Sequence, residues 1–257
     1  MLGNLIEIIR DTGREVSKSR LQCVDGGKWE GDQLKTQADA LAHKLLAMKL
    51  SDVLPIPVVS EENSFSQSEV RPDKYWLIDP IDGTRSLVDG FPGWVIQAAL
   101  IQNNEPQIAV IFAPDLDLTF TAEKGEGAFC NSRKLSLDSA DKSRLLLIDN
   151  YPEPRGIAAD LCNGIPCTGY VECGSIALKI CKIADGTSDL FVKDVPVRDW
   201  DIAAPKLIIE EAGGCLKTYS GRDYLLTGKF EKMGLIAARD VSVYKKCQSF
   251  LKTRTST

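Results

Sequence analysis

The sequence predicts a mixed α/β fold with a helical N-terminus, a central antiparallel sheet and a second half of alternating strands and helices. Apolar residues recur at helical spacing at the start of the chain, and strand-like runs separated by turn signals follow them. After about residue 140, short strands alternate with helical stretches. We therefore predict an N-terminal α+β lobe over residues 1–140 and a C-terminal α/β lobe over residues 141–257, which share one core.

The N-terminal lobe is predicted to begin with two helices. Apolar positions from Leu2 to Val16 predict an amphipathic helix over residues 2 to about 19. The segment "KTQADALAHKLLAMKL" (35–50) predicts the second helix, with Thr36 as its N-cap. The strands expected next are "IPVVS" (56–60), "KYWLID" (74–79), "GWVIQAALIQ" (93–102), "QIAVIFAP" (107–114) and "LTFTAEKG" (118–125). Turn signals separate the last three, which favours an antiparallel meander.

The C-terminal lobe is predicted to alternate short strands with helices. The expected strands are "RLLLID" (144–149), "LFV" (190–192), "CLKTY" (215–219) and "GLIAA" (234–238). The expected helices lie near residues 156–163, 174–185, 202–212 and 240–252.

Composition and charge exclude several classes of partner. The net charge of -5 supplies no global basic field for nucleic acid or an anionic membrane, so an anionic substrate would need a local device such as a metal. No run approaches the roughly 18 apolar residues of a membrane-spanning helix, and the charged N-terminus does not resemble a signal peptide. Eight cysteines without a CxxC pair, beside a single histidine, argue against structural zinc and indicate reduced thiols in a cytoplasmic protein.

The stretch "WLIDPIDGTRS" (76–86) places two acids at the end of an apolar strand. Pro80 restricts the turn, and Gly83 allows the backbone to approach a ligand closely. If a helix follows, the free N–H groups of Gly83 and Thr84 form an anion cradle. The carboxylates of Asp79 and Asp82 can act on the same anionic ligand as this cradle if a divalent cation such as Mg²⁺ lies between the carboxylates and that ligand. The alternative interpretation is a capped turn at a strand end.

Further acids follow other predicted elements. "VVSEEN" ends a short apolar run in Glu61 and Glu62. "VRDWDIAAPKLIIEEAGG" presents Asp199 and Asp201 just before an apolar helix. Asp201 alone is most simply an N-cap, with Pro205 in the first turn, where N–H groups lack internal partners.

Together these stretches resemble the inositol monophosphatase superfamily of Mg²⁺-dependent, lithium-sensitive phosphatases. "WLIDPIDGT" matches the first signature W-x-[IV]-D-P-[IL]-D-G-T, and "WDIAAPKLIIEEAGG" matches W-D-x-A-A followed by E-A-G-G. The upstream acid pair is present in "SEEN". The resemblance covers essentially the whole chain and implies a layered αβαβα sandwich of the inositol monophosphatase and fructose bisphosphatase type.

The resemblance also implies two or three Mg²⁺ ions in the active site. Glu61, Asp79 and the backbone carbonyl of Ile81 are expected to bind the first. Asp79, Asp82 and Asp201 are expected to bind the second.

Thr84 resembles the family threonine that orients the attacking water, and Asp39 in "KTQADALA" is the candidate for its acidic partner. Without the resemblance, Asp39 would be read as a solvated helix residue. Glu62 is expected to be a supporting acid or to lie near a third metal, and His43 to be structural or exposed. The implied mechanism is direct displacement by a metal-activated water, with Glu61 and Thr84 holding that water and with no covalent nucleophile.

The substrate remains open between branches of the superfamily. Where inositol monophosphatases usually carry an acid before W-D, this chain has "LFVKDVPVRDWD", with Lys193 and Arg198. Cations there suit a substrate with a second negative group, and "CGSIALKI" also favours the branch that cleaves 3'-phosphoadenosine 5'-phosphate. The alternatives are an inositol or broad sugar phosphatase acting on esters such as fructose 1,6-bisphosphate, a catalytically silent regulatory relative, and, for the two cations, ordinary surface charge.

The expected substrate contacts are Asp82, Gly83, Thr84, Gly174, Ser175, Lys193, Arg198 and Asp201. By analogy with many family members, the expected assembly is a homodimer.

Overall fold

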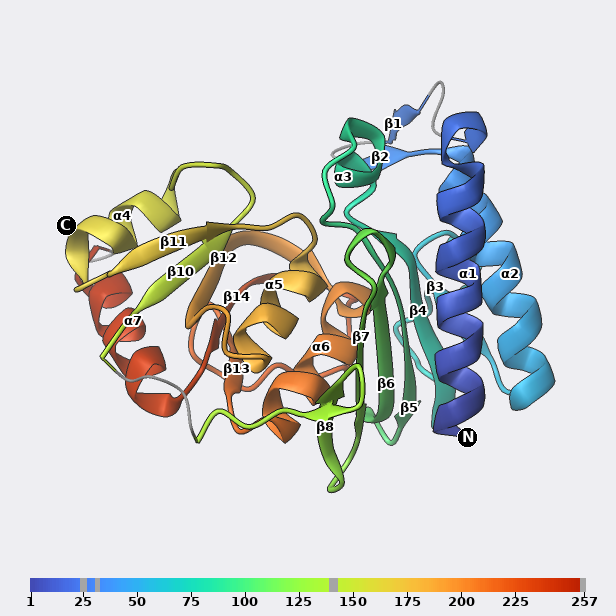
Figure 1. Cartoon of the computed structure of the whole chain (residues 1–257). Helices are drawn as coiled ribbons and strands as arrows, with labels where there is room; N and C mark the ends of the chain where they lie inside the picture. The colour runs from blue at the N-terminus through green and yellow to red at the C-terminus, as the bar shows by residue number, and fades with distance from the viewer. Residues whose placement is uncertain (24–26, 31–32, 139–142, 255–257) are drawn as a thin grey trace.

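The chain folds into alternating layers of helices and sheets (Figure 1). The computed structural model describes residues 1–23, 27–30, 33–138 and 143–254. The α-helices are α1 (Leu2–Cys23), α2 (Gln37–Val53), α3 (Thr84–Asp89), α4 (Ile157–Gly164), α5 (Ile176–Ala184), α6 (Asp199–Glu211) and α7 (Val241–Arg254). From one side to the other the layers are α1 and α2, a seven-stranded sheet, α5 and α6, a five-stranded sheet, and α4 and α7. The predicted αβαβα sandwich is confirmed.

The seven-stranded sheet is built mainly by a meander. Its strands, in spatial order, are β3 (Val58–Ser60), β4 (Lys74–Asp82), β5 (Val95–Gln102), β6 (Glu105–Ala113), β7 (Leu118–Glu123), β8 (Gly127–Cys130) and β9 (Arg133–Lys134). Each pair from β4 to β9 is antiparallel, whereas β3 and β4 are parallel. The carboxyl ends of β3 and β4 therefore lie at the same edge of the sheet.

The five-stranded sheet is mixed. Its strands, in spatial order, are β11 (Gly169–Glu172), β10 (Leu146–Asp149), β12 (Leu190–Arg198), β14 (Glu231–Ala238) and β13 (Cys215–Thr218). β10 runs parallel to β11 and β12, and β14 is antiparallel to β12 and β13. A separate hairpin pairs β1 (Lys28–Glu30) with β2 (Gln33–Lys35).

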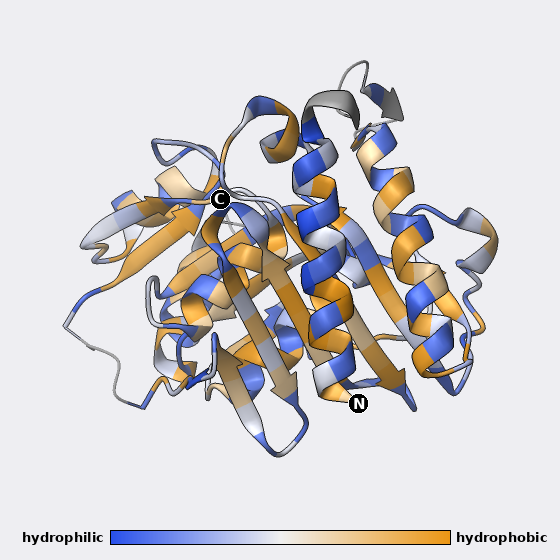
Figure 2. Cartoon of the chain, turned by 45° about the vertical axis from the view of Figure 1, so that its right-hand side comes forward, coloured by the Kyte–Doolittle hydropathy of each residue, from blue (hydrophilic) through white to orange (hydrophobic). Residues whose placement is uncertain are grey.

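Amphipathic helices cover the outer face of the first sheet. α1 and α2 turn apolar residues such as Leu5, Leu46 and Leu50 toward Trp76 and Ile96 of the strands, and all five side chains are buried. Figure 2 shows the corresponding pattern, with hydrophobic strands behind helices that are polar on their outer sides. No helix among the described residues is long and apolar enough to cross a bilayer.

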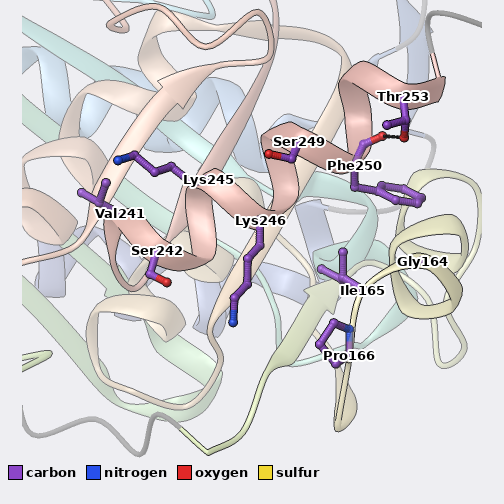
Figure 3. A pocket seen from close by; sticks show the side chains of 10 residues that line it. All are labelled: Gly164, Ile165, Pro166, Val241, Ser242, Lys245, Lys246, Ser249, Phe250 and Thr253. Carbon is purple, nitrogen blue, oxygen red and sulfur yellow. Dashed lines mark hydrogen bonds between the residues drawn. The ribbon is translucent and has the colours of Figure 1, made fainter.

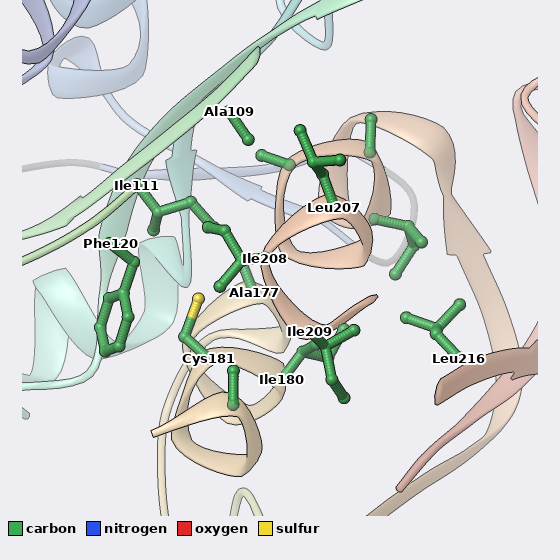
Figure 4. Packing of buried hydrophobic residues seen from close by; sticks show 14 of the residues in the cluster. Ala109, Ile111, Phe120, Ala177, Ile180, Cys181, Leu207, Ile208, Ile209 and Leu216 are labelled. Carbon is green, nitrogen blue, oxygen red and sulfur yellow. The ribbon is translucent and has the colours of Figure 1, made fainter. Parts of the chain in front are cut away.

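The central helical layer joins the two halves of the chain. α5 and α6 pack between the sheets, so that Ile208 and Cys181 meet Ile111 and Phe120 of the first sheet, and Leu216 of the second sheet belongs to the same buried cluster (Figure 4). One continuous core thus spans both sheets. The change from one sheet to the other falls between residues 134 and 146, and the division into lobes at residue 140 stays a prediction.

Two boundaries next to the acids differ from the sequence predictions. β4 does not end at Asp79 but continues to Asp82, with a register irregularity between the two acids that accommodates Pro80. α6 begins at Asp199, not at residue 202, so Arg198 is its N-cap and Asp201 its third residue. Pro205 consequently lies inside the helix, beyond the first turn. The short strands β1, β2, β8, β9 and β11 were not predicted, because such brief segments carry too little periodicity.

Candidate active site

Acids from three elements meet at one edge of the seven-stranded sheet. Glu61 follows β3 directly, Asp79 and Asp82 occupy the end of β4, and Asp201 lies in the first turn of α6. Ligand oxygens of Asp79, Asp82 and Asp201 all lie within 4.8 Å of one another. The parallel pairing of β3 with β4 and the position of α6 between the sheets create this cluster.

The irregular end of β4 orients the first of these acids. Asp79 Oδ1 accepts a hydrogen bond from the N–H of Ile81 at 3.0 Å. Gly83 then adopts a φ of +92°, a left-handed conformation that ends the strand and starts α3. A Cβ on Gly83 would approach the Gly93 carbonyl and the Ser175 Cβ at 3.2 Å, so the local fit also favours glycine.

The other two acids are held by helix N-termini. Asp82 accepts hydrogen bonds from the N–H groups of Ile176 at 3.3 Å and Ala177 at 2.7 Å, in the first turn of α5. Asp201 accepts one from the N–H of Arg198 at 2.9 Å. The contacts of Asp82 tie the end of the first sheet to α5, whereas the contact of Asp201 is a capping interaction within the start of α6.

A bound cation would stabilise the ionised carboxylates of this cluster. Burial raises the pKa of Asp79, Asp82 and Asp201, and it raises the pKa of Glu61 to about 7. The neighbouring carboxylates add to the increase at Asp79 and Asp201. Without a cation these acids retain protons or repel one another. Because carboxylate and carbonyl oxygens suit Mg²⁺, the residues fit the metal expected here.

Thr84 and Asp39 form a hydrogen-bonded pair beside the cluster. Thr84 Oγ1 donates to Asp39 Oδ1 at 3.0 Å and lies 3.3 Å from the carbonyl oxygen of Ile81. The other oxygen of Asp39 accepts from the N–H and hydroxyl of Thr36, in a capping box at the start of α2. Asp39 is only 3% exposed, so the solvated-residue interpretation is wrong.

A lysine that the sequence analysis did not assign lies beside the acid pair. Lys35 Nζ is 2.6 Å from Glu62 and 3.9 Å from Glu61. Although burial alone would lower the pKa of Lys35, the two glutamates raise it overall. Glu62 thus has a structural partner, and His43 has one in Ser60, whose Oγ lies 2.9 Å from its Nδ1.

A buried polar network supports the start of α6. Asp199 is fully buried and accepts from Lys232 Nζ at 2.6 Å and from Tyr224 OH at 2.9 Å. Arg71, from the segment between β3 and β4, reaches across to pair with the same carboxylate and stacks on the Phe230 ring. Long-range pairs of this kind have no signal in the sequence.

A cavity of about 810 Å³ opens beside Asp82. Its lining residues are Asp82, Gly83, Arg85, Ser86, Asp89, Phe91, Asn150, Tyr151, Pro152, Glu172, Gly174, Ser175, Ile176 and Lys193. The structure therefore brings together the predicted contacts Gly83, Gly174, Ser175 and Lys193. Arg198 is not in this lining, and its guanidinium instead lies 3.3 Å from Glu231.

A second cavity lies between the end of α4 and α7 (Figure 3). It has a volume of about 940 Å³ and is bordered by Ile165, Phe250, Lys245 and Lys246. Its lining contains no carboxylate, so it does not provide the ligands of a divalent cation.

Comparison with known proteins defines the class of this site. A sequence model of the inositol monophosphatase family matches residues 4–251. Mouse inositol monophosphatase 1 is 29% identical over 228 residues, covering 83% of this chain and 79% of the relative. The 3'(2'),5'-bisphosphate nucleotidase CysQ of Aggregatibacter actinomycetemcomitans is 27% identical over 246 residues, or 90% and 91% of the two chains. Nus factor SuhB of Escherichia coli is 26% identical over 89% of each chain.

The fold comparison agrees. The structure of a Thermotoga maritima IMPase superposes with a TM-score of 0.82 at 25% identity, covering 98% of this chain and 96% of the other. The fold and its acidic cluster define a phosphoric monoester hydrolase. The chain belongs to the inositol monophosphatase family.

Proposed function

We propose that this protein is a Mg²⁺-dependent phosphomonoesterase whose preferred substrate is 3'-phosphoadenosine 5'-phosphate. The observation that supports phosphoryl chemistry is the convergence of Asp79, Asp82 and Asp201 beside the Thr84–Asp39 pair. Bound Mg²⁺ supplies the positive charge that lowers the pKa of water and stabilises a phosphate in the transition state. Two or three ions in the site, and sensitivity to lithium, belong to the same proposal.

The protein residues hold and orient the reactants. Thr84 Oγ1 donates its hydrogen bond to Asp39, so a lone pair on Oγ1 is left to accept a hydrogen bond from a water. The capping box fixes Asp39, so the water has a defined position relative to the phosphate. Glu61 is the second candidate for holding that water, and the carbonyl of Ile81, beside Thr84, is the candidate backbone ligand.

The cavity favours a substrate that is larger and more charged than a simple sugar phosphate. Its lining includes Asp82 and Ser175, together with Lys193, Phe91 and Tyr151. A cation suits a second phosphate, and aromatic rings suit the face of a base. Arg198 does not line this cavity, so the cavity does not support its predicted role as a substrate contact.

Two other functions are tested by assaying phosphate release from three substrates, namely the adenosine bisphosphate, inositol 1-phosphate and fructose 1,6-bisphosphate. Hydrolysis of inositol 1-phosphate or fructose 1,6-bisphosphate in preference to the adenosine bisphosphate would identify an inositol or broad sugar phosphatase. Absence of phosphate release from all three substrates would favour a regulatory relative without catalytic activity. The complete set of acids argues against that alternative, because silent relatives have no need of a buried carboxylate cluster. A cytoplasmic location and a homodimer remain predictions.

Lys193→Glu is expected to reduce use of the adenosine bisphosphate more than use of inositol 1-phosphate. A second phosphate loses a favourable contact and meets a like charge. Contacts to charged groups contribute roughly 1.5 to 3 kcal/mol, which corresponds to a tenfold or larger change in kcat/KM. The control is Lys124→Glu, which makes the same charge change at an exposed residue after β7. Equal responses of both substrates would mean that Lys193 is ordinary surface charge.

Mg²⁺ binding is expected to strengthen as the pH rises through 7. The pKa of Glu61 is raised to about 7, so below that pH the metal must displace a proton. Apparent affinity should then rise roughly tenfold per pH unit below the pKa for each proton displaced, and level off above it. Conversely, the metal-free protein should lose stability between about pH 4.5 and 7, as Glu61 ionises among other acids. Calorimetry in buffers of different ionisation heats would measure the released protons. Binding that does not change from pH 6 to 8 would contradict the prediction.

A further inference from the structure

A fully buried lysine lies beneath the cavity and has no assigned role. Lys179, in the first turns of α5, is 0% exposed. Lysine is almost never fully buried unless it is paired, because its ammonium loses its hydration. In the part of the chain that the structure describes, no carboxylate lies within ion-pair distance of Nζ. Burial lowers the pKa of Lys179, although the more distant carboxylates of Asp149 and Asp82 oppose part of that shift. Packing of α5 alone does not explain a buried ammonium at this position.

The ammonium of Lys179 instead has three neutral acceptors at the cavity. Nζ donates to the side-chain Oδ1 of Asn150, to the Gly174 carbonyl at 2.6 Å and, more weakly, to the Ser175 carbonyl at 3.4 Å. Asn150, Gly174 and Ser175 all line the cavity beside Asp82. The three donors of one buried lysine therefore organise one wall of the site.

The contact with Asn150 determines which atoms of that amide face the cavity. Lysine can only donate hydrogen bonds, so the amide must turn its oxygen toward Nζ. The NH₂ group of Asn150 is then directed away from Lys179, and no described residue accepts a hydrogen bond from it. Asn150 itself is exposed, directly after β10, and it borders the cavity with Lys193.

We propose that Lys179 is a positioning residue for specificity, which fixes Asn150 so that its NH₂ group donates to an oxygen on the non-reacting part of the substrate. With Lys193 in the same wall, the oxygen that suits this donor best belongs to a second phosphate. The inference rests on the proposed function for the identity of that substrate, but the role of the amide does not depend on it.

The decisive variant is Asn150→Asp. It preserves the shape of the side chain and gives Lys179 a carboxylate partner, so folding should not suffer. It replaces the NH₂ donor by an anionic acceptor. We expect KM for 3'-phosphoadenosine 5'-phosphate to rise about tenfold or more while kcat and the Mg²⁺ dependence stay nearly unchanged, because the reacting end is untouched. KM for inositol 1-phosphate should change less.

Lys179→Met tests the lysine itself, with Lys206→Met as the matched control. Lys206 is also largely buried, but it pairs with Glu210 on α6 and does not line the cavity. Lys179→Met should raise KM in the same direction as Asn150→Asp, Lys179→Arg should recover part of the effect, and Lys206→Met should leave KM unchanged.

An unchanged KM in Asn150→Asp, or a fall in kcat at constant KM, would overturn the inference even if Lys179→Met does not fold. A wild-type preference for inositol 1-phosphate would reject the proposed substrate alone. The effect of Asn150→Asp on KM for the preferred ester would then still decide the role of the amide.

Discussion

Asp82→Asn is expected to abolish nearly all turnover and leave the fold intact. The amide of asparagine keeps an oxygen for one N–H of α5 but lacks the charge that a divalent cation requires. Loss of several kcal/mol of charge stabilisation in the transition state corresponds to a rate reduction of about a thousandfold or more. Phosphate release at saturating Mg²⁺ measures the effect, and circular dichroism checks the fold.

The control for removing a buried carboxylate is Asp189→Asn. Asp189 is also buried and pairs with Arg239 at 2.8 Å, outside the acidic cluster. The substitution should reduce thermal stability, because the buried guanidinium of Arg239 exchanges an ionic partner for a neutral one, while activity per folded molecule persists. Asp82→Asn should instead abolish activity without a loss of thermal stability, since it removes one of several repelling charges from the metal-free protein. Comparable turnover in the two variants would contradict our assignment of Asp82.

Thr84→Ala is expected to reduce kcat about a hundredfold with little change in Mg²⁺ affinity. In the proposed assignment the hydroxyl, which donates to Asp39, positions a water and does not bind the metal. Loss of a single positioning group commonly has an effect of this size. Rates measured across a range of Mg²⁺ concentrations separate the two quantities.

Two further variants identify the group responsible. Thr84→Ser keeps the hydroxyl and should retain much of the activity. Asp39→Asn should resemble Thr84→Ala, because its oxygen can no longer hold the Thr84 proton as a carboxylate does. If Thr84→Ala weakens Mg²⁺ binding as much as it slows the reaction, Thr84 is a metal contact and our assignment is wrong.

Local signals in the sequence predicted the elements with the clearest periodicity. Helical spacing after Leu2, and the cap at Thr36, located α1 and α2, and the Asn-Asn turn separated β5 from β6. The end of β4 was misplaced, because proline and glycine read as a turn, whereas pairing with β5 carries the strand through an irregularity to Asp82. Pairing between strands is a tertiary effect that no local signal contains.

The acids of the site could be predicted because they follow strands or begin helices in recognisable motifs. The residues that support these acids through long-range or buried contacts could not be predicted. Lys35, Arg71 and Lys179 reach their partners across large separations or through burial, so each looks like an ordinary charged residue in the sequence. The same holds for Arg198, whose pairing with Glu231 on the adjacent strand depends on the register of β12 with β14.

The thiols of the described cysteines are buried or partly buried, and their reduced state stays a prediction. The seven cysteines whose side chains are described, from Cys130 to Cys247, are free, and the side chain of Cys23 lies outside the described residues. Burial raises the pKa of Cys173 to about 11, which disfavours its thiolate form.

Phosphate release as a function of free Mg²⁺ is the most direct test of a metal-dependent phosphatase built on Asp79, Asp82 and Asp201. The purified protein would be assayed with 3'-phosphoadenosine 5'-phosphate, inositol 1-phosphate and fructose 1,6-bisphosphate. We expect no release in excess chelator, full recovery when Mg²⁺ is restored, and a saturable dependence on the ion that Asp82→Asn lacks. Undiminished phosphate release in excess chelator would contradict this account.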